Sequence, residues 1–119
     1  MNSMELCERV VRSLDKHKAQ DISAIGVADL TVVTDYFVVA GGTSQNHVRS
    51  LADYLEDELA VDGVIVRRTE GYNESKWVLL DFGSVVVHLF QPDTREYYDL
   101  ERLWKDGVQV DITPWTTED

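Results

Sequence analysis

The segment from Trp77 to Phe90, WVLLDFGSVVVHLF, decides the fold of this chain. It contains two apolar, β-rich runs, 77–82 and 85–90, which are joined by the pair Gly83-Ser84. A short connection that contains glycine is typical of an antiparallel hairpin. Because side chains alternate between the two faces of a strand, the sequence also predicts what each face of this hairpin carries.

One face of the predicted hairpin is aliphatic apart from Phe82, and we expect it to pack against helices: Val78, Leu80, Phe82, Val85, Val87 and Leu89. The other face is mixed, and it comprises Trp77, Leu79, Asp81, Val86, His88 and Phe90. The mixed face is too apolar for plain solvent exposure and too polar for a core. An apolar patch rimmed with charge is typical of a protein interface, where Trp is a favoured anchor. The alternative is that another helix, in particular the C-terminal one, covers this face.

Apolar periodicity predicts the other elements outward from the hairpin. We expect helices over 3–18, 44–60 and 95–104, the first capped by Ser3 and the second by Ser44, and strands over 22–27, 36–40 and 64–68. This order predicts an α/β fold with a single mixed β-sheet of about five strands and flanking helices. The last dozen residues are expected to be irregular, so we predict a domain over 1–106 and a C-terminal tail over 107–119.

The charge balance favours a basic protein partner. The chain has 119 residues, with 11 Lys and Arg against 22 Asp and Glu, which gives a formal net charge of −11. Such a surface argues against extensive nucleic-acid contact, because binding phosphates needs Lys and Arg, whereas opposite charge speeds encounter with a basic protein. The alternative is that the acidity serves solubility alone.

The sequence predicts a cytoplasmic protein with no membrane contact. No run of about 18 apolar residues is present, and the N-terminal stretch carries acids where a signal or transit peptide would be apolar or Arg-rich. Cys7 is the sole cysteine, so no intramolecular disulfide can form and a reducing compartment is expected. Cys7 itself is expected to be a small buried hydrophobe.

The search for chemistry gives no catalytic, cofactor or metal residues. The turn Gly41–Ser44 follows a predicted strand and opens a helix, where backbone amides can hold an anion. Similar turns occur in nucleotidyltransferases, which also need paired carboxylates for two Mg²⁺ ions, and the nearby strands offer Asp81 alone. His17, His47 and His88 are scattered over three elements, which argues against a zinc site. The alternative function is a nucleotide-binding or nucleotidyltransferase-like enzyme that uses this turn.

Several longer motifs together resemble the Iojap family, the bacterial ribosomal silencing factors (RsfS). They are Thr34–Val39 (TDYFVV), Gly42–Ser44, Glu70-Gly71, Trp77–Gly83 (WVLLDFG), Val85–Phe90 (VVVHLF) and Arg95–Trp104 (REYYDLERLW). The resemblance covers about residues 4–104, nearly the whole chain. It implies a fold like that of nucleotidyltransferases without their catalytic acids, and a homodimer when the protein is free.

The resemblance also implies a function. Members of this family bind protein fourteen of the large ribosomal subunit (uL14), block association of the subunits and so repress translation under nutrient limitation. We expect the partner-binding residues to be Lys76, Trp77, Leu79, Asp81, His88, Phe90, Tyr97 and Tyr98. Of the two adjacent tyrosines, Tyr98 is expected to be the better exposed. Trp104 is expected in the core.

Overall fold

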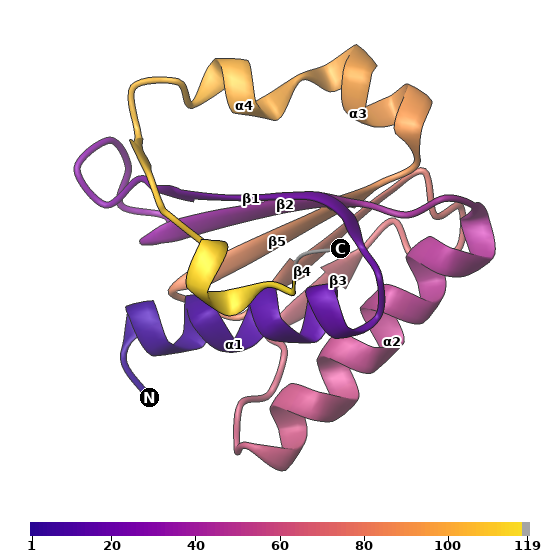
Figure 1. Ribbon diagram of the computed structural model, residues 1–119, viewed down its shortest axis with the longest axis horizontal. Coiled ribbons are helices and arrows are strands. Elements are labelled where there is room, and N and C mark those ends of the chain that lie inside the picture. Colours follow the sequence, from indigo (N-terminus) through magenta and orange to yellow (C-terminus); the bar gives the residue numbers. More distant parts are fainter. Residues whose placement is uncertain (118–119) are drawn as a thin grey trace.

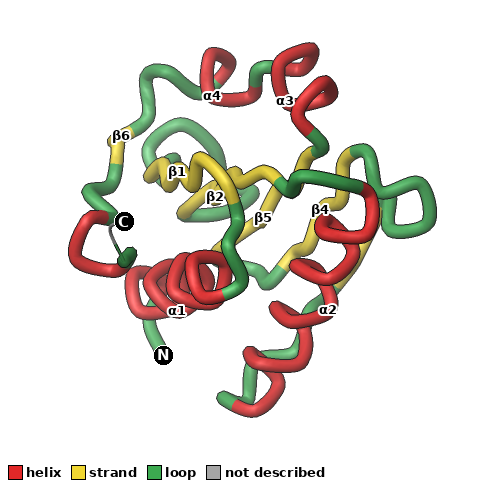
Figure 2. Tube along the Cα trace, turned by 45° about the vertical axis from the view of Figure 1, so that its right-hand side comes forward, coloured by secondary structure: helices red, strands yellow, loops and turns green. Residues whose placement is uncertain are grey.

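A six-stranded mixed sheet lies between two layers of helices in the computed structural model, which describes residues 1–117. Helices α1 and α2 cover one face of the sheet, and the short helices α3 and α4 lie over the other (Figures 1 and 2). The helices are α1 (Ser3–Lys16), α2 (Gln45–Val61), α3 (Pro92–Tyr98), α4 (Leu100–Leu103) and the 3₁₀ helix η1 (Thr113–Trp115). The strands are β1 (Gln20–Gly26), β2 (Tyr36–Gly41), β3 (Arg68–Glu70), β4 (Trp77–Asp81), β5 (Val85–Phe90) and β6 (Val108–Gln109).

The strands follow the order β3-β4-β5-β2-β1-β6 across the sheet. The predicted hairpin is confirmed: β4 and β5 pair antiparallel, with Trp77 opposite Phe90. Strands β2 and β5 pair in parallel, with Tyr36 opposite Val85, and the other neighbours are antiparallel. The hairpin therefore stands next to β2, and the crossover through α2 carries the chain past it to the β3 edge.

The aliphatic face of the hairpin packs against α1 and α2, as predicted. Its six side chains join one core with the apolar stripes of both helices. The stripe of α1 includes Val10 and Leu14, and that of α2 includes Leu51 and Leu55, all of which are fully buried. Cys7 lies in the same core, and burial raises the pKa of its thiol to about 12.

Local hydrogen bonds move several element boundaries away from the predicted ones. Helix α1 is capped by Asn2 rather than Ser3, because the Asn2 side chain accepts from the Glu5 amide at 2.8 Å while the Glu5 carboxylate accepts from the Asn2 amide at 2.9 Å. Ser44 caps α2 as predicted. The predicted strand 64–68 is wrong, because the amide of Val64 still bonds to α2 and strand pairing starts at Arg68.

The predicted irregularity of the last dozen residues is wrong for those that the structure describes, and residues 118 and 119 lie outside the described part. Val108 and Gln109 pair with Gly26 and Ile25 of β1 and form the sixth strand, where about five were expected. Beyond them, Trp115 in η1 packs against the main core. A strand of two residues is too short to show an alternating pattern in the sequence. It forms because it pairs with β1, which is distant in the sequence. No helix within residues 1–117 combines the length and the hydropathy needed to cross a membrane.

Candidate functional site

The mixed face of the hairpin is half covered, so the prediction that it is an open surface is wrong for three of its residues. Val86, His88 and Phe90 are all buried. The chain after β5 turns back over this face, and Leu100 and Trp104 of its α3–α4 segment pack against it. The alternative derived from the sequence, a covering C-terminal helix, accounts for this half of the face.

Trp77 connects the covered half to the surface. Its ring lies 5.2 Å from that of Phe90 beneath it and 4.6 Å from that of Tyr98 above it, measured between centroids. Its indole N–H donates a hydrogen bond of 3.0 Å to Nδ1 of His88. Trp77 is half-buried. Because both sides of the ring and its one polar atom have partners, its orientation is fixed before any ligand arrives.

His88 holds Trp77 from within the sheet. Burial lowers the pKa of the His88 imidazole to about 4, so the ring is neutral near pH 7. Because Nδ1 accepts from the indole, the proton of the neutral ring lies on Nε2. Phe37 flanks the imidazole at 5.2 Å between ring centroids. His88 is therefore a positioning residue below the surface, and it does not contact solvent enough to bind a partner directly.

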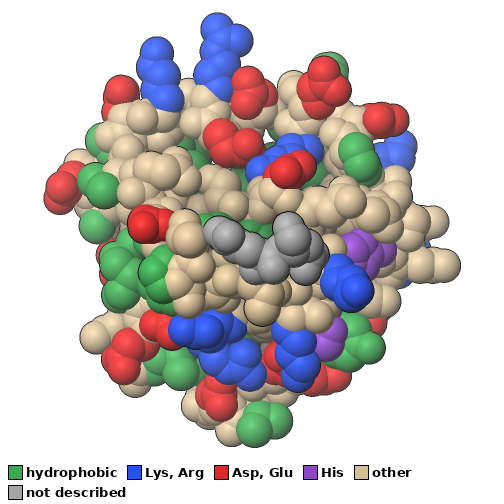
Figure 3. Space-filling view, viewed as in Figure 1, with side chains coloured by type: hydrophobic (Ala, Val, Ile, Leu, Met, Phe, Trp, Pro, Cys, Tyr) green, Lys and Arg blue, Asp and Glu red, His purple; other side chains and the backbone are tan. Residues whose placement is uncertain are grey.

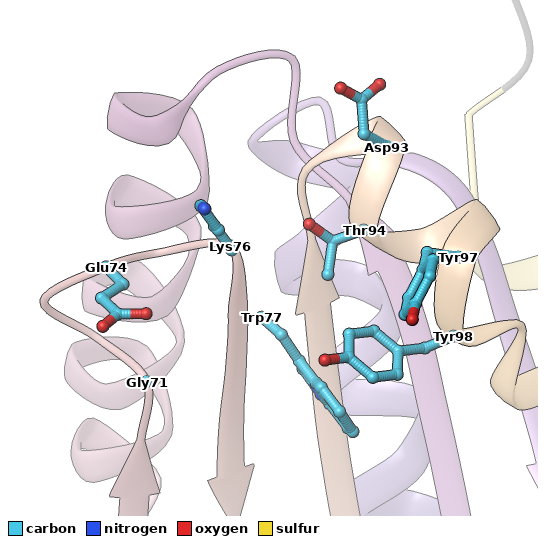
Figure 4. A pocket seen from close by; sticks show the side chains of 8 residues that line it. All are labelled: Gly71, Glu74, Lys76, Trp77, Asp93, Thr94, Tyr97 and Tyr98. Atoms are coloured by element: carbon cyan, nitrogen blue, oxygen red, sulfur yellow. The ribbon is translucent and has the colours of Figure 1, made fainter.

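A groove of about 530 Å³ opens beside Trp77, between the loop before β4 and helix α3 (Figure 4). It is lined by Gly71, Glu74, Lys76, Trp77, Asp93, Thr94, Tyr97 and Tyr98. Tyr97 is 82% exposed and Tyr98 is 45% exposed, which reverses the predicted order. The reason is that α3 turns the Tyr98 ring onto Trp77, whereas the Tyr97 ring meets Tyr98 edge-on at 5.1 Å.

The loop from Gly71 to Lys76 is held in place by its neighbours on both sides. The Arg49 guanidinium of α2 donates to the Ser75 hydroxyl at 2.8 Å, and the Gln91 side chain donates to the Ser75 carbonyl at 3.0 Å. Gly71 has a φ of +80°, and a Cβ there would lie 2.1 Å from the carbonyl oxygen of Trp77. This wall of the groove is thus preorganised, which lowers the entropic cost of binding a partner.

The predicted partner-binding residues fall into three groups. Four of them line the groove: Lys76, Trp77, Tyr97 and Tyr98. His88 and Phe90 lie beneath it. Leu79 packs beside Val86, and the carboxylate of Asp81 accepts from the amide of Gly83 at 2.8 Å, so both lie farther along β4.

Sequence reasoning missed two acidic residues of the groove, Glu74 and Asp93. Glu74 stands three residues before Trp77, and this closeness was an available signal. Asp93 lies in the first turn of α3, and nothing in the sequence indicated that α3 folds back beside the loop that carries Glu74. The two carboxylates give the groove acidic flanks around an aromatic floor, with Lys76 the sole cation among its lining residues.

Two backbone amides of the turn Gly41–Ser44 already have hydrogen-bond partners within the protein. The Gly42 amide donates to the carbonyl of Phe90 at 2.9 Å, and the Thr43 amide donates to Nδ1 of His47 at 2.9 Å. A Cβ on Gly42 would lie 2.7 Å from a methyl group of Val48, so close helix packing explains this glycine. The turn therefore offers little to a phosphate. Within residues 1–117, no three His, Cys, Asp or Glu side chains are grouped so as to hold a metal ion.

Comparison with known proteins gives one consistent family. The family model described as "Ribosomal silencing factor during starvation" matches residues 1–119. The ribosomal silencing factor RsfS of Bacillus subtilis is 37% identical over 112 residues, which cover 94% of this chain and 95% of that protein. The mouse protein named "Mitochondrial assembly of ribosomal large subunit protein 1" is 38% identical over 100 residues, covering 82% of this chain and 44% of that protein. A crystal structure from Chromobacterium violaceum superposes with a TM-score of 0.87 at 33% identity, covering 98% of this chain and all of that one.

Proposed function

The chain belongs to the family of ribosomal silencing factors, and from this premise we propose that it binds uL14 on the large subunit and blocks association with the small subunit. The groove beside Trp77 is the proposed docking site. The observation that carries the proposal is this groove itself, where exposed tyrosines meet a fixed tryptophan between two carboxylates. Aromatic side chains of this kind are the usual energetic anchors of protein interfaces.

Charge supports a ribosomal protein as the partner. The formal net charge of −11 attracts basic proteins and repels the phosphates of ribosomal RNA. Glu74 and Asp93 place part of this charge at the rim of the groove. In such an arrangement the aromatic rings bury apolar surface against the partner. The carboxylates at the rim attract the basic partner and fix its alignment in the groove. The mouse relative, whose name refers to assembly of the large subunit, agrees with this choice of subunit.

Blocking requires occupancy and no catalytic step. The described chain extends 33 × 33 × 32 Å. Subunit bridges depend on contacts of about 3–4 Å, so a rigid body of this size on the joining face keeps the opposite surface out of reach. A docking interface of about 800 Å² on each partner suffices for a stable complex. Repression of translation follows, since unjoined subunits do not translate, and the family description, which refers to starvation, supports nutrient limitation as the condition.

Replacement of Tyr97 tests the docking site with little risk to folding. Tyr97→Ala removes an aromatic ring that is 82% exposed, and we expect it to weaken binding to large subunits at least tenfold, as hot-spot residues do at about 2 kcal/mol or more. Tyr54→Ala is the matched control, because Tyr54 is a half-exposed tyrosine on α2, across the sheet from the groove. The assays are co-sedimentation with large subunits and reassociation of subunits in sucrose gradients.

The outcomes separate the residue assignment from the function. Equal blocking by wild type, Tyr97→Ala and Tyr54→Ala would place the docking surface elsewhere on the protein. Failure of the wild type itself to block reassociation would refute the proposed function. Isothermal titration with ATP and Mg²⁺ provides the check on the nucleotide-binding alternative, for which we expect no heat of binding.

A homodimer of the free protein through the same groove must dissociate before the protein docks. One surface cannot hold two partners, so dimerisation and ribosome binding would compete. Light scattering of the free protein reports a homodimer as twice the 13.6 kDa of one chain, and co-sedimentation with large subunits reports docking. If Tyr97→Ala weakens both, the contacts coincide. If it weakens only one, they are separate surfaces.

A further inference from the structure

A second cleft opens at the β6 edge of the sheet, on the side away from the Trp77 groove. Its volume is about 730 Å³, and its walls come from the start of α1, the turn after β1 and the segment around β6. Strands β5, β2 and β1 separate β6 from β4. At about 4.8 Å per strand, the two surfaces are far enough apart for both to be occupied at once.

The walls of this cleft are apolar and accessible. Met4, Leu30 and Val108 line it and are 42%, 46% and 69% exposed, respectively. The half-buried rings of Tyr36 and Trp115 complete the lining. Hydrophobic side chains accordingly gather beside acidic ones along the left edge of the face in Figure 3, where Figure 1 shows the turn after β1. Figure 2 labels β6 on the same side. Single exposed apolar residues are ordinary, whereas a lined cleft of them is typical of a binding surface.

Every charged residue that lines the cleft is an aspartate: Asp29, Asp35, Asp106 and Asp111. Among residues 1–117, none of these four carboxylates forms an ion pair. Asp111 accepts from the Thr113 amide at 3.0 Å, and hydrogen bonding from Thr113 lowers the pKa of its carboxyl. The cleft therefore combines an apolar wall with four carboxylates that have no cationic partner among the described residues.

We propose that this cleft binds a short basic segment of a second protein, rich in Lys or Arg. A Lys or Arg side chain suits such a surface, because its aliphatic stem lies along apolar groups while its charged head reaches a carboxylate. Nucleic acid does not fit, since its phosphates would meet four aspartates. The same cleft on a second copy of this chain does not pair with this one, because all four charged residues that line it are aspartates. The proposal does not depend on the function assigned to the Trp77 groove.

The test uses a synthetic peptide of about ten alternating Lys and Leu residues, titrated into the ¹⁵N-labelled full chain. The alternation matches the mixture of charge and apolar wall that defines the cleft. We expect the largest amide shifts at Asp29, Gly107 and Asp111. A peptide with Glu in place of Lys is the control, and we expect no shifts with it. Shifts confined to the Trp77 groove, or equal shifts with both peptides, would overturn the proposal.

Paired substitutions then measure the contribution of the carboxylates. Asp29→Asn with Asp106→Asn removes two exposed charges of the cleft, and we expect the Kd for the Lys-Leu peptide to rise about five- to tenfold. Asp53→Asn with Asp57→Asn on α2 changes the net charge equally, and we expect less than about a twofold rise. Equal effects of the two pairs would show nonspecific attraction and refute the site. Light scattering of the free chain tests a second copy of this chain as the occupant. If Asp29→Asn with Asp106→Asn abolished self-association, the cleft would be a contact between copies, and the proposal would be refuted.

Discussion

Protonation of His88 should destabilise the folded protein in a defined pH window. The imidazole is buried and its pKa in the fold is about 4, against 6.5 for the exposed group. A folded-state pKa below the unfolded one means that the unfolded chain binds more protons between these values. Stability is therefore highest above pH 6.5 and falls as the pH is lowered toward 4.

The magnitude follows from the two pKa values. At pH 5 the unfolded His88 is almost fully protonated and the folded one is almost fully neutral. The free energy of unfolding should consequently be lower at pH 5 than at pH 7 by about 2 kcal/mol from this residue alone. Protonation also places a hydrogen on Nδ1, which then can no longer accept from the indole of Trp77. This loosening of the groove tryptophan should set in only as the pH falls to about 4, because the folded ring is still neutral at pH 5.

Urea unfolding at pH 7 and pH 5, followed by far-UV circular dichroism, measures the effect. The control is His88→Gln, because glutamine does not titrate and its amide oxygen can still accept from Trp77. Other groups, including the acids, titrate alike in both proteins, so the difference between the two pH dependences isolates His88. We expect the wild type to lose about 2 kcal/mol more than His88→Gln between these pH values. Parallel pH dependences of the two proteins would refute the reasoning.

Three further tests probe the fold that supports the groove. Leu80→Ala, at a fully buried position, should lower the free energy of unfolding by about 2–5 kcal/mol, whereas Leu103→Ala, which is 71% exposed, should change it by less than about 0.5 kcal/mol in the same urea titration. Gly42→Ala should lower the thermal midpoint, because its Cβ would lie 2.7 Å from a methyl group of Val48; an unchanged midpoint would show that α2 can shift freely. The Cys7 thiol, with its pKa raised to about 12 by burial, should resist Ellman's reagent at pH 8 until denaturant is added, and rapid reaction of the native protein would contradict its burial.

The sequence predicts the centre of the fold well because alternation and periodicity are local signals. The hairpin from Trp77 to Phe90 and its aliphatic face are confirmed. The packing stripes of α1 and α2 are confirmed for the same reason. Each of these elements repeats its apolar pattern over several residues. The sequence therefore predicts the elements that bury most of the apolar area.

What the sequence could not give depends on how distant segments dock. The predicted helix 95–104 is two short helices, since Asp99 takes a left-handed φ of 47° between them. This break lets Leu100 reach Phe90 while Tyr98 reaches Trp77. The docking of α3 and α4 on the sheet decides whether a residue of the mixed face is exposed or buried. The alternation of side chains along a strand carries no information about this docking. For that physical reason the sequence offered the covering C-terminal helix only as an alternative, and it did not predict the acidic rim at Asp93.

The proposed repression works by occupancy of a docking surface and needs no reaction. This predicts how the repression should depend on the concentration of the protein. A protein that obstructs by occupancy inhibits in proportion to the fraction of large subunits it covers. Inhibition of reassociation should therefore rise with the molar ratio of protein to large subunit and level off at about one per subunit when the concentration is well above Kd. An enzyme that modified the ribosome would act at much lower ratios, and its effect would persist after removal of the protein. Titration followed by a wash thus separates the two mechanisms, and we expect reassociation to recover fully after the wash.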